Sequence, residues 1–134
     1  YAAYSLARSI ERRDPLGILL ARPSTVQAYE AVAKQFGFDQ DIVLLEGNSK
    51  GLWMPCRPTT STKKVILYFH APAYMEHYTM LLDHVTKFGA SEVVVLMAAY
   101  TLAPESRYPT QLSQAASMLN YLLEVEKLPP SKVS

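Results

Sequence analysis

The chain has 134 residues, of which 49% are hydrophobic and 19% are charged, and its formal net charge is +1. This length predicts one modest domain or part of a larger one, and the composition excludes an intrinsically disordered chain. The near-neutral charge argues against nucleic acid as a partner, because nucleic acids require a concentrated basic surface. No apolar run is long enough to cross a membrane, so we expect no membrane span in this chain.

The cellular location is left open by the sequence, although a cytoplasmic location is favoured. Cys56 is the single cysteine and cannot form an intramolecular disulfide. The first residues lack the charged-then-apolar order of a signal peptide. Because the chain begins at tyrosine, an upstream leader or anchor stays open as an alternative.

Residues 1–37 are predicted to form two helices. Residues 2–13 carry apolar side chains on one helical face, and an aspartate-proline pair closes that segment. Ser24 and Gln27 have the spacing of a capping box, and apolar residues then recur at helical spacing as far as Gly37. We therefore expect a second helix between Ser24 and Gly37.

Two short apolar segments follow, at residues 41–46 and 51–57. They flank Gly-Asn-Ser-Lys at residues 47–50, which has the composition of a hairpin turn. This arrangement predicts an antiparallel pair of strands.

Residues 58–134 change to an alternation of strands and helices. Residues 65–69 are apolar throughout, and residues 92–97 are apolar after the initial glutamate, as expected of central parallel strands that are covered on both faces. Between them, an apolar helical face runs from Tyr78 to Phe88. A second helix follows, and Lys132-Val133 is interpreted as the start of a third parallel strand. The apolar face predicted for the second helix consists of Leu112, Ala115, Ala116, Leu119, Leu122 and Leu123.

Residues 98–123 read AAYTLAPESRYPTQLSQAASMLNYLL. The tyrosine at the strand end, the Leu-Ala-Pro-Glu run and the later aromatic-proline pair resemble the α/β-hydrolases related to hormone-sensitive lipase, in a fungal-type branch. The matching positions are Tyr100, Leu102, Ala103, Pro104, Glu105, Tyr108 and Pro109.

The resemblance implies the fold and its division. We expect an α/β chain that is the N-terminal half of an α/β-hydrolase fold, with an antiparallel hairpin followed by parallel βαβα. Residues 1–37 would be N-terminal helices and a candidate lid, and residues 38–134 the first half of the sheet domain. The sheet would be completed by a missing or separate C-terminal portion, which is the expected partner.

In the resembled family, the strand that here ends at residue 69 leads into a His-Gly-Gly-Gly loop. The backbone N–H groups of that loop form part of the oxyanion hole for ester hydrolysis. The corresponding loop and pocket residues are His70, Ala71, Pro72, Ala73 and Tyr74. Because proline has no N–H, one donor is expected to be absent.

Three further positions depart from the resembled pattern. Ala99 and Thr101 stand where many relatives carry an aspartate and an arginine, and Gln114 replaces an acidic residue. We interpret them as lost structural ion pairs, and simple drift within the family is the favoured alternative to a functional meaning.

The resemblance also implies a lid over the active site, built from the N-terminal helices. The residues expected to face the pocket are Tyr4, Leu6, Ile10 and Tyr29. The alternative for the second helix is that it packs on the flank of the sheet.

No catalytic residue of the resembled family is found in this chain. The family's serine lies in a G-x-S-x-G turn, which is absent, and its acid and histidine follow further on. His77 and His84 are seven residues apart, which does not match the spacing of helical zinc ligands, so we expect no metal site and interpret them as surface or interface histidines. We also expect no cofactor.

Two functions from different classes remain. The first is part of a hydrolase acting on an ester or acyl-type small apolar molecule. The second is a repurposed hydrolase fold that performs a non-hydrolytic step on a small apolar metabolite, or merely binds it. A stand-alone binding module is a third alternative, weakened by the apolar sheet edge that it would leave uncovered.

Overall fold

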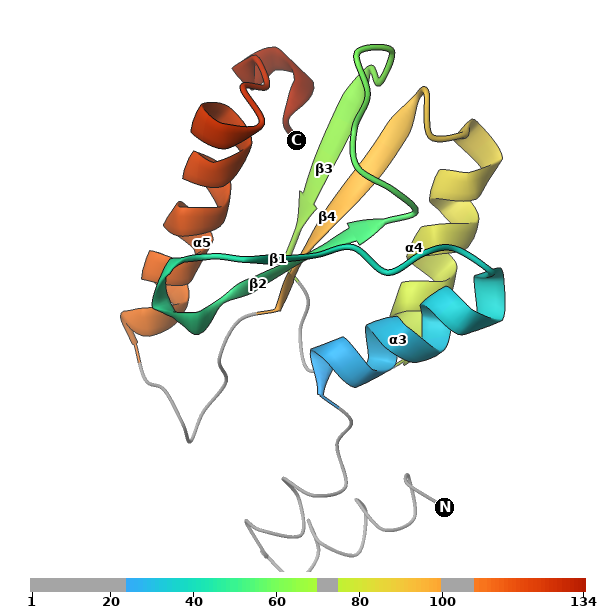
Figure 1. Cartoon of the computed structure of the whole chain (residues 1–134), viewed down its shortest axis with the longest axis horizontal. Coiled ribbons are helices and arrows are strands. Elements are labelled where there is room, and N and C mark those ends of the chain that lie inside the picture. Colours follow the sequence, from blue (N-terminus) through green and yellow to red (C-terminus); the bar gives the residue numbers. More distant parts are fainter. Residues whose placement is uncertain (1–23, 70–74, 100–107) are drawn as a thin grey trace, which may run out of the picture.

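The computed structural model describes residues 24–69, 75–99 and 108–134, and only the backbone of residues 75–79. These ranges contain a mixed four-stranded sheet with helices on both of its faces (Figure 1). The first predicted helix, residues 2–13, lies outside the described residues.

Helix α3 (Thr25–Phe36) begins and ends as its sequence predicts. The backbone N–H of Gln27 donates to the Ser24 hydroxyl at 3.1 Å, and the N–H of Ser24 donates to the Gln27 side chain at 2.9 Å. These two bonds satisfy donors that a helix start leaves unpaired. Gly37 ends the helix in a left-handed conformation with φ of 71°, which glycine adopts without steric cost. The prediction of this helix is confirmed.

Replacing Ser24 with alanine should lower the free energy of unfolding by about 1 kcal/mol, because it removes the hydroxyl that accepts the N–H of Gln27, while the backbone bond to the Gln27 side chain is kept. Urea denaturation measures the loss. Glu30→Ala is the control, since Glu30 is exposed in the middle of the same helix. Equal losses in the two variants would show that the cap contributes nothing specific.

The strands are β1 (Ile42–Leu44), β2 (Lys50–Met54), β3 (Lys64–Tyr68) and β4 (Val93–Ala99), and they lie in the order β1-β2-β4-β3. A short 3-10 turn, η1 (Glu46–Asn48), joins β1 to β2. The β1–β2 and β2–β4 pairs are antiparallel, whereas β3 and β4 are parallel. The predicted hairpin and parallel pair are therefore both confirmed.

The end of the chain lies along the outer side of β3. Val133 forms a parallel bridge with Val65. The N–H of Ser134 donates to the Val65 carbonyl at 3.0 Å, and the N–H of Leu67 donates to the Ser134 carbonyl at 2.8 Å. These contacts form an isolated parallel bridge at the position where the sequence predicts the start of a third parallel strand.

The remaining helices lie on opposite faces of the sheet. Helix α4 (Met75–Phe88) is on the same face as α3, and α5 (Thr110–Asn120) is on the other (Figure 1). A π-helical turn, η2 (Tyr121–Val125), continues α5, and a 3-10 turn, η3 (Pro130–Lys132), precedes Val133.

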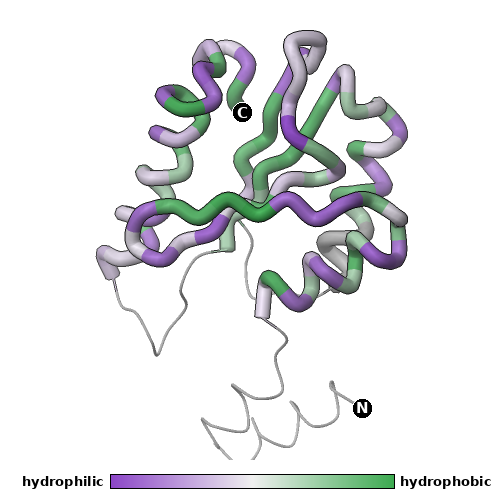
Figure 2. The backbone as a smooth tube through the Cα atoms, in the orientation of Figure 1, coloured by the Kyte–Doolittle hydropathy of each residue, from purple (hydrophilic) through white to green (hydrophobic). Residues whose placement is uncertain are grey.

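Because side chains alternate along a strand, the sheet supports two separate hydrophobic cores. Leu52, Met54 and Met97 face α3 and α4, whereas Trp53 and Leu96 face α5. Most residues of β3 and β4 are hydrophobic, as the colours of Figure 2 show. Both cores are fully buried at these positions.

The orientation predicted for α5 is wrong at three positions, because Ala116 is exposed as well as two of the leucines. Leu112 is 60% exposed and Leu119 is 41% exposed, while Gln114 and Met118 are buried against the sheet. The physical reason is a hydrogen bond of 2.7 Å from the Gln114 amide to the carbonyl of Gly47, which draws this polar side chain inward. Leu112 and Leu119 are therefore exposed on α5, whereas Leu122, which was predicted on the same face, is buried as expected.

Candidate active site

The candidate site lies at one edge of the sheet, where β3 and β4 end. Because these strands are parallel and Tyr68 pairs with Met97, their carboxyl ends lie at the same edge. The antiparallel β2 begins there, since Lys50 pairs with Ala99. Open α/β sheets place their ligands outside the carboxyl ends of parallel strands. This edge is therefore the place for a site.

The described residues at this edge include a partly open aromatic side chain and a tightly fixed turn. Phe69, which follows β3, is 46% exposed. Ser49 is fully buried, and its hydroxyl donates to the Glu46 carbonyl at 3.0 Å. Together with the Gln114 bond to Gly47, this contact fixes the β1–β2 turn against α5. Gln114, which we interpreted as the remnant of an ion pair, instead holds a backbone carbonyl.

Most of the predicted site residues lie outside the described residues. The five positions between the ends of the described segments at 69 and 75 are the loop residues His70, Ala71, Pro72, Ala73 and Tyr74. The lid residues Tyr4, Leu6 and Ile10 also lie outside. Their roles stay predictions.

Tyr29 is the one predicted lid residue that the structure describes, and it lies in the core. Its side chain is fully buried between α3 and the sheet. The hydroxyl donates to the Trp53 carbonyl at 2.8 Å and accepts from the N–H of Asp41 at 2.8 Å. Burial raises the pKa of this phenol, so it stays neutral. We therefore assign Tyr29 to the packing of α3 on the sheet and not to the lid.

A polar network that the sequence did not suggest joins the hairpin to the turn after α5. Arg57 donates two hydrogen bonds to the Asp41 carboxylate, at 2.6 and 3.0 Å, and lies 3.5 Å from Glu126. Glu126 in turn accepts a hydrogen bond from the hydroxyl of Tyr121. The two aromatic rings of Trp53 and Tyr121 lie 6.4 Å apart. In the sequence these residues are recognisable only as charged or aromatic side chains. That does not reveal which residues from distant parts of the chain will pair.

The Tyr121 hydroxyl should ionise only at a pH of about 12. Burial and the hydrogen bond to Glu126 raise its pKa from 10.0 to about 12. A raised pKa stabilises the folded protein below pH 10, and this contribution is lost as the pH rises towards 12. The absorbance of tyrosinate at 295 nm measures the transition. Tyr121→Phe should remove this late step, and an unchanged titration curve in the variant would contradict the assignment.

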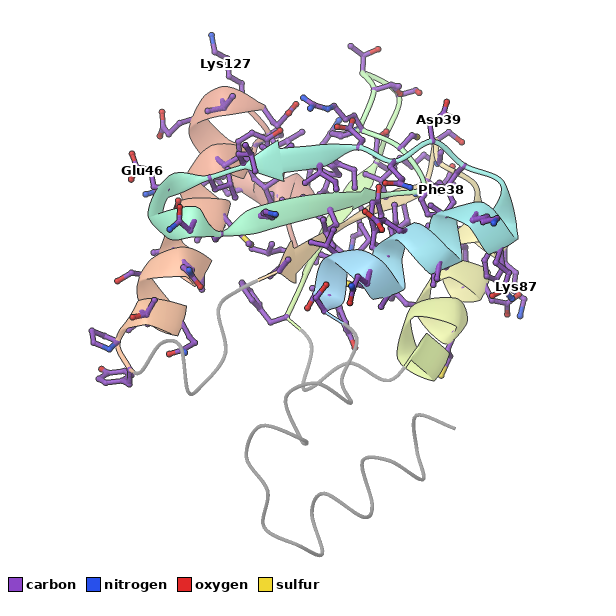
Figure 3. All side chains as sticks on the ribbon, turned by 60° about the horizontal axis from the view of Figure 1, so that its bottom comes forward. Phe38, Asp39, Glu46, Lys87 and Lys127 are labelled. Carbon is purple, nitrogen blue, oxygen red and sulfur yellow. The ribbon has the colours of Figure 1, made fainter. Side chains whose placement is uncertain are left out.

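Two surface hollows lie elsewhere on the described chain. One, of about 320 Å³, is lined by the end of β1, the C-terminal end of α5 and the turn η2, including Leu44 and Val125. The other, of about 630 Å³, lies beside α3 and includes Phe38 and Asp39, which Figure 3 shows in the segment after that helix. Neither hollow is lined by β3 or β4, so neither coincides with the candidate site.

Within the described ranges, no three histidine, cysteine, aspartate or glutamate side chains gather as metal ligands. The exposed His84 instead contacts the ring of Phe88, with 5.3 Å between the ring centres. None of the helices described is long and apolar enough to cross a membrane.

Comparison with known proteins shows which family this architecture matches. Residues 66–133, slightly more than half of the chain, match the family described as the alpha/beta hydrolase fold. No curated protein matches the sequence.

Three solved structures resemble the chain. Esterase E25 has a TM-score of 0.56 and 15% identity, over 78% of this chain and 32% of its own. The Francisella virulence factor BioJ has a TM-score of 0.53 and 18% identity, over 79% and 37%. A hormone-sensitive lipase from a metagenome library has a TM-score of 0.50 and 18% identity, over 78% and 36%. The chain therefore spans about a third of the length of these proteins, and at such identities the likeness shows the fold alone.

Proposed function

Because this chain belongs to the α/β-hydrolase fold family, we propose that it is the N-terminal half of an enzyme that cleaves an ester or acyl bond in a small apolar molecule. The observation that carries the proposal is that the matched residues include β4 and most of β3, which end at one edge of the sheet. This is where the α/β-hydrolase fold builds its active site. The similarity of the fold to esterase E25 and to a hormone-sensitive lipase supports the same reaction class.

In this proposal, the loop after β3 forms one wall of the substrate pocket and supplies backbone N–H groups to the oxyanion. His70 leads into the loop, and the donors would come from the residues around Ala71 and Ala73. Pro72 contributes no N–H, so the oxyanion would be held by fewer hydrogen bonds than in a glycine loop. The active site would therefore be a weak catalyst of simple ester hydrolysis.

The nucleophile, the acid and the histidine would come from a complementary C-terminal portion. Two features of the described chain support such a partner. The outer edge of β3 carries only an isolated parallel bridge, at Val133 and Ser134. The exposed apolar side chains Leu112 and Leu119 lie on α5, and Met80 and Phe88 lie on α4. A portion that adds strands beside β3 and helices on both faces would bury all of them, which is favourable for apolar surface.

The N-terminal residues before α3 form the lid in this proposal. Leu6 and Ile10 would face the pocket and keep water from the reacting bond. The substrate class follows from these apolar side chains, since a pocket lined by them favours an apolar acyl or alcohol group.

A repurposed fold is the second candidate, and the specific observation that favours it is Pro72. A hydrolase fold that has lost an oxyanion donor can still bind an apolar metabolite in the same pocket. In that case, the complete protein would bind such a molecule without cleaving an ester.

Fluorophosphonate labelling distinguishes the two candidates, because this probe reacts with activated serine nucleophiles. The chain is produced together with its complementary portion, and labelling and the hydrolysis of a p-nitrophenyl ester are measured. Labelling with slow turnover supports the hydrolase, whereas binding of an apolar molecule without labelling supports the repurposed fold. Size measurement of the chain by itself tests the partner. A stable, soluble monomer would contradict the need for a complementary portion.

A further inference from the structure

The turn after α5 has an unusual geometry. In residues 121–125 the helix is a π-helix, and the N–H of Glu126 donates to the carbonyl of Tyr121 at 3.1 Å. Such a turn holds one residue more than an α-helical turn. It brings Tyr121 and Glu126, which are five positions apart, onto one side, whereas an α-helix pairs residues three or four apart. The hydrogen bond between these two side chains therefore depends on the π-helical form.

This turn is tied to the β1–β2 hairpin through four residues, which we call the latch: Tyr121, Glu126, Arg57 and Asp41. Tyr121 is almost completely buried beside Trp53, and Glu126 lies 3.5 Å from Arg57. Asp41 immediately precedes β1, and its carboxylate accepts both hydrogen bonds from Arg57. The Arg57 side chain is half exposed, so solvent weakens its ion pairs with Asp41 and Glu126. The buried hydroxyl of Tyr121 should therefore contribute more to the stability of the latch than these ion pairs do.

The segment between the turn and the sheet is held in place by hydrogen bonds. The N–H of Leu128 donates to the Leu122 carbonyl at 3.0 Å, and the ammonium of Lys132 donates to the Thr62 carbonyl at 2.9 Å. Val133 then packs against the core cluster that contains Trp53 and Val65. Lys127, whose side chain points away from the molecule in Figure 3, makes the reversal with a positive φ of 52°. A change in the turn would therefore be passed on to Val133.

We propose that the latch sets the register of the strand that begins at Val133. Relaxation of the π-helical turn to an α-helix would move the following chain by one residue. A slip of one residue turns the side chains of a strand to the opposite face of the sheet, so Val133 would leave the Trp53 cluster. The proposed register depends on these contacts alone. Its consequence for catalysis rests on the proposed function, in which this strand leads to the nucleophile.

Amide hydrogen exchange, followed by NMR on the protein without substrate, tests the proposal independently of any hydrolysis. Tyr121→Phe removes the hydroxyl of the latch and leaves the ring. The amides of Leu67 and Ser134, which carry the rungs between β3 and the new strand, should then exchange about tenfold faster. Amides of the β2–β4 pair should keep their rates. Equal acceleration in both places, or none at Leu67 and Ser134, would overturn the proposal.

Tyr29→Phe is the matched control. It also removes a buried tyrosine hydroxyl with protein partners, but on the α3 face of the sheet. The exchange of Leu67 and Ser134 should not respond selectively to this change. If Tyr29→Phe exposes these two amides as strongly as Tyr121→Phe does, the effect is general destabilisation and the latch has no specific role.

Deletion of Glu124 tests the register directly. Glu124 is exposed within the π-helical turn, and its removal takes away the additional residue. Tyr121 and Glu126 would then stand four positions apart, which suits an α-helix. The deletion variant should therefore keep Val133 opposite Val65, as shown by nuclear Overhauser contacts between their methyl groups. Displacement of Val133 from Val65 in this variant would contradict the proposed mechanism.

Discussion

Replacing Trp53 with alanine should lower the free energy of unfolding by about 3–5 kcal/mol, as is typical when a large aromatic side chain is removed from a core. Trp53 is fully buried in β2 and packs between the sheet and the turn after α5. A small domain is stabilised by only about 5–15 kcal/mol, so this loss would leave a marginal fold. Chemical denaturation followed by circular dichroism measures it, since the substitution removes the fluorescent indole.

Trp53→Phe separates packing from hydrogen bonding in this experiment. The indole N–H of Trp53 is buried and has no hydrogen-bond partner among the described residues. Phenylalanine therefore fills much of the space and removes no hydrogen bond, so we expect it to recover most of the loss. If both variants lose stability equally, the indole N–H makes a contact that the structure does not show.

The second large effect concerns the loop after β3. Substituting glycine at Ala71, Pro72 and Ala73 in the protein joined to its complementary portion should raise the rate of aryl ester hydrolysis. One additional oxyanion donor is worth roughly a hundredfold to a thousandfold in kcat. Steady-state kinetics with a p-nitrophenyl ester measures the change, and the gain should appear in kcat more than in KM because the donor acts on the transition state.

Separate substitutions provide the control, because they distinguish the effect of Pro72 from that of the two alanines. Ala71→Gly with Ala73→Gly leaves Pro72 in place and should give little of the gain, whereas Pro72→Gly should give most of it. A parent protein that already hydrolyses the ester at rates typical of esterases, with no gain in the glycine variant, would show that Pro72 does not limit the oxyanion hole.

The sequence predicted the secondary structure of the described chain well, because the signals are local. The Ser24 and Gln27 capping box, the glycine at the end of α3 and the alternation of the hairpin each depend on a few neighbouring residues. The parallel pairing of β3 and β4 also followed, since continuous apolar strands joined by a helix favour a parallel arrangement. The α/β-hydrolase fold expected from the resemblance is confirmed by the family match.

The side-chain arrangement could not be predicted in the same way. Periodicity assigned Leu112 and Leu119 to the core, but a single long-range hydrogen bond from Gln114 to Gly47 accompanies a different orientation of α5. The partners Arg57 and Glu126 come from separate elements and meet only after the sheet has formed. The resemblance implies a lid built from the N-terminal helices and so makes Tyr29 a lid candidate, whereas its hydroxyl bonds the backbone of Trp53 in β2 and of Asp41 just before β1.

The position of β4 has a consequence for the order in which the sheet assembles. β4 lies between β2 and β3, and it pairs with the antiparallel hairpin on one side and with the parallel strand β3 on the other. The hairpin closes over a short turn, but β4 must return across the whole of β3 and α4 before it can insert. Closing such a long loop costs more conformational entropy, which slows non-local pairing. Until β4 arrives, the hairpin and β3 have no backbone connection within the sheet, so β4 controls the cooperativity of folding.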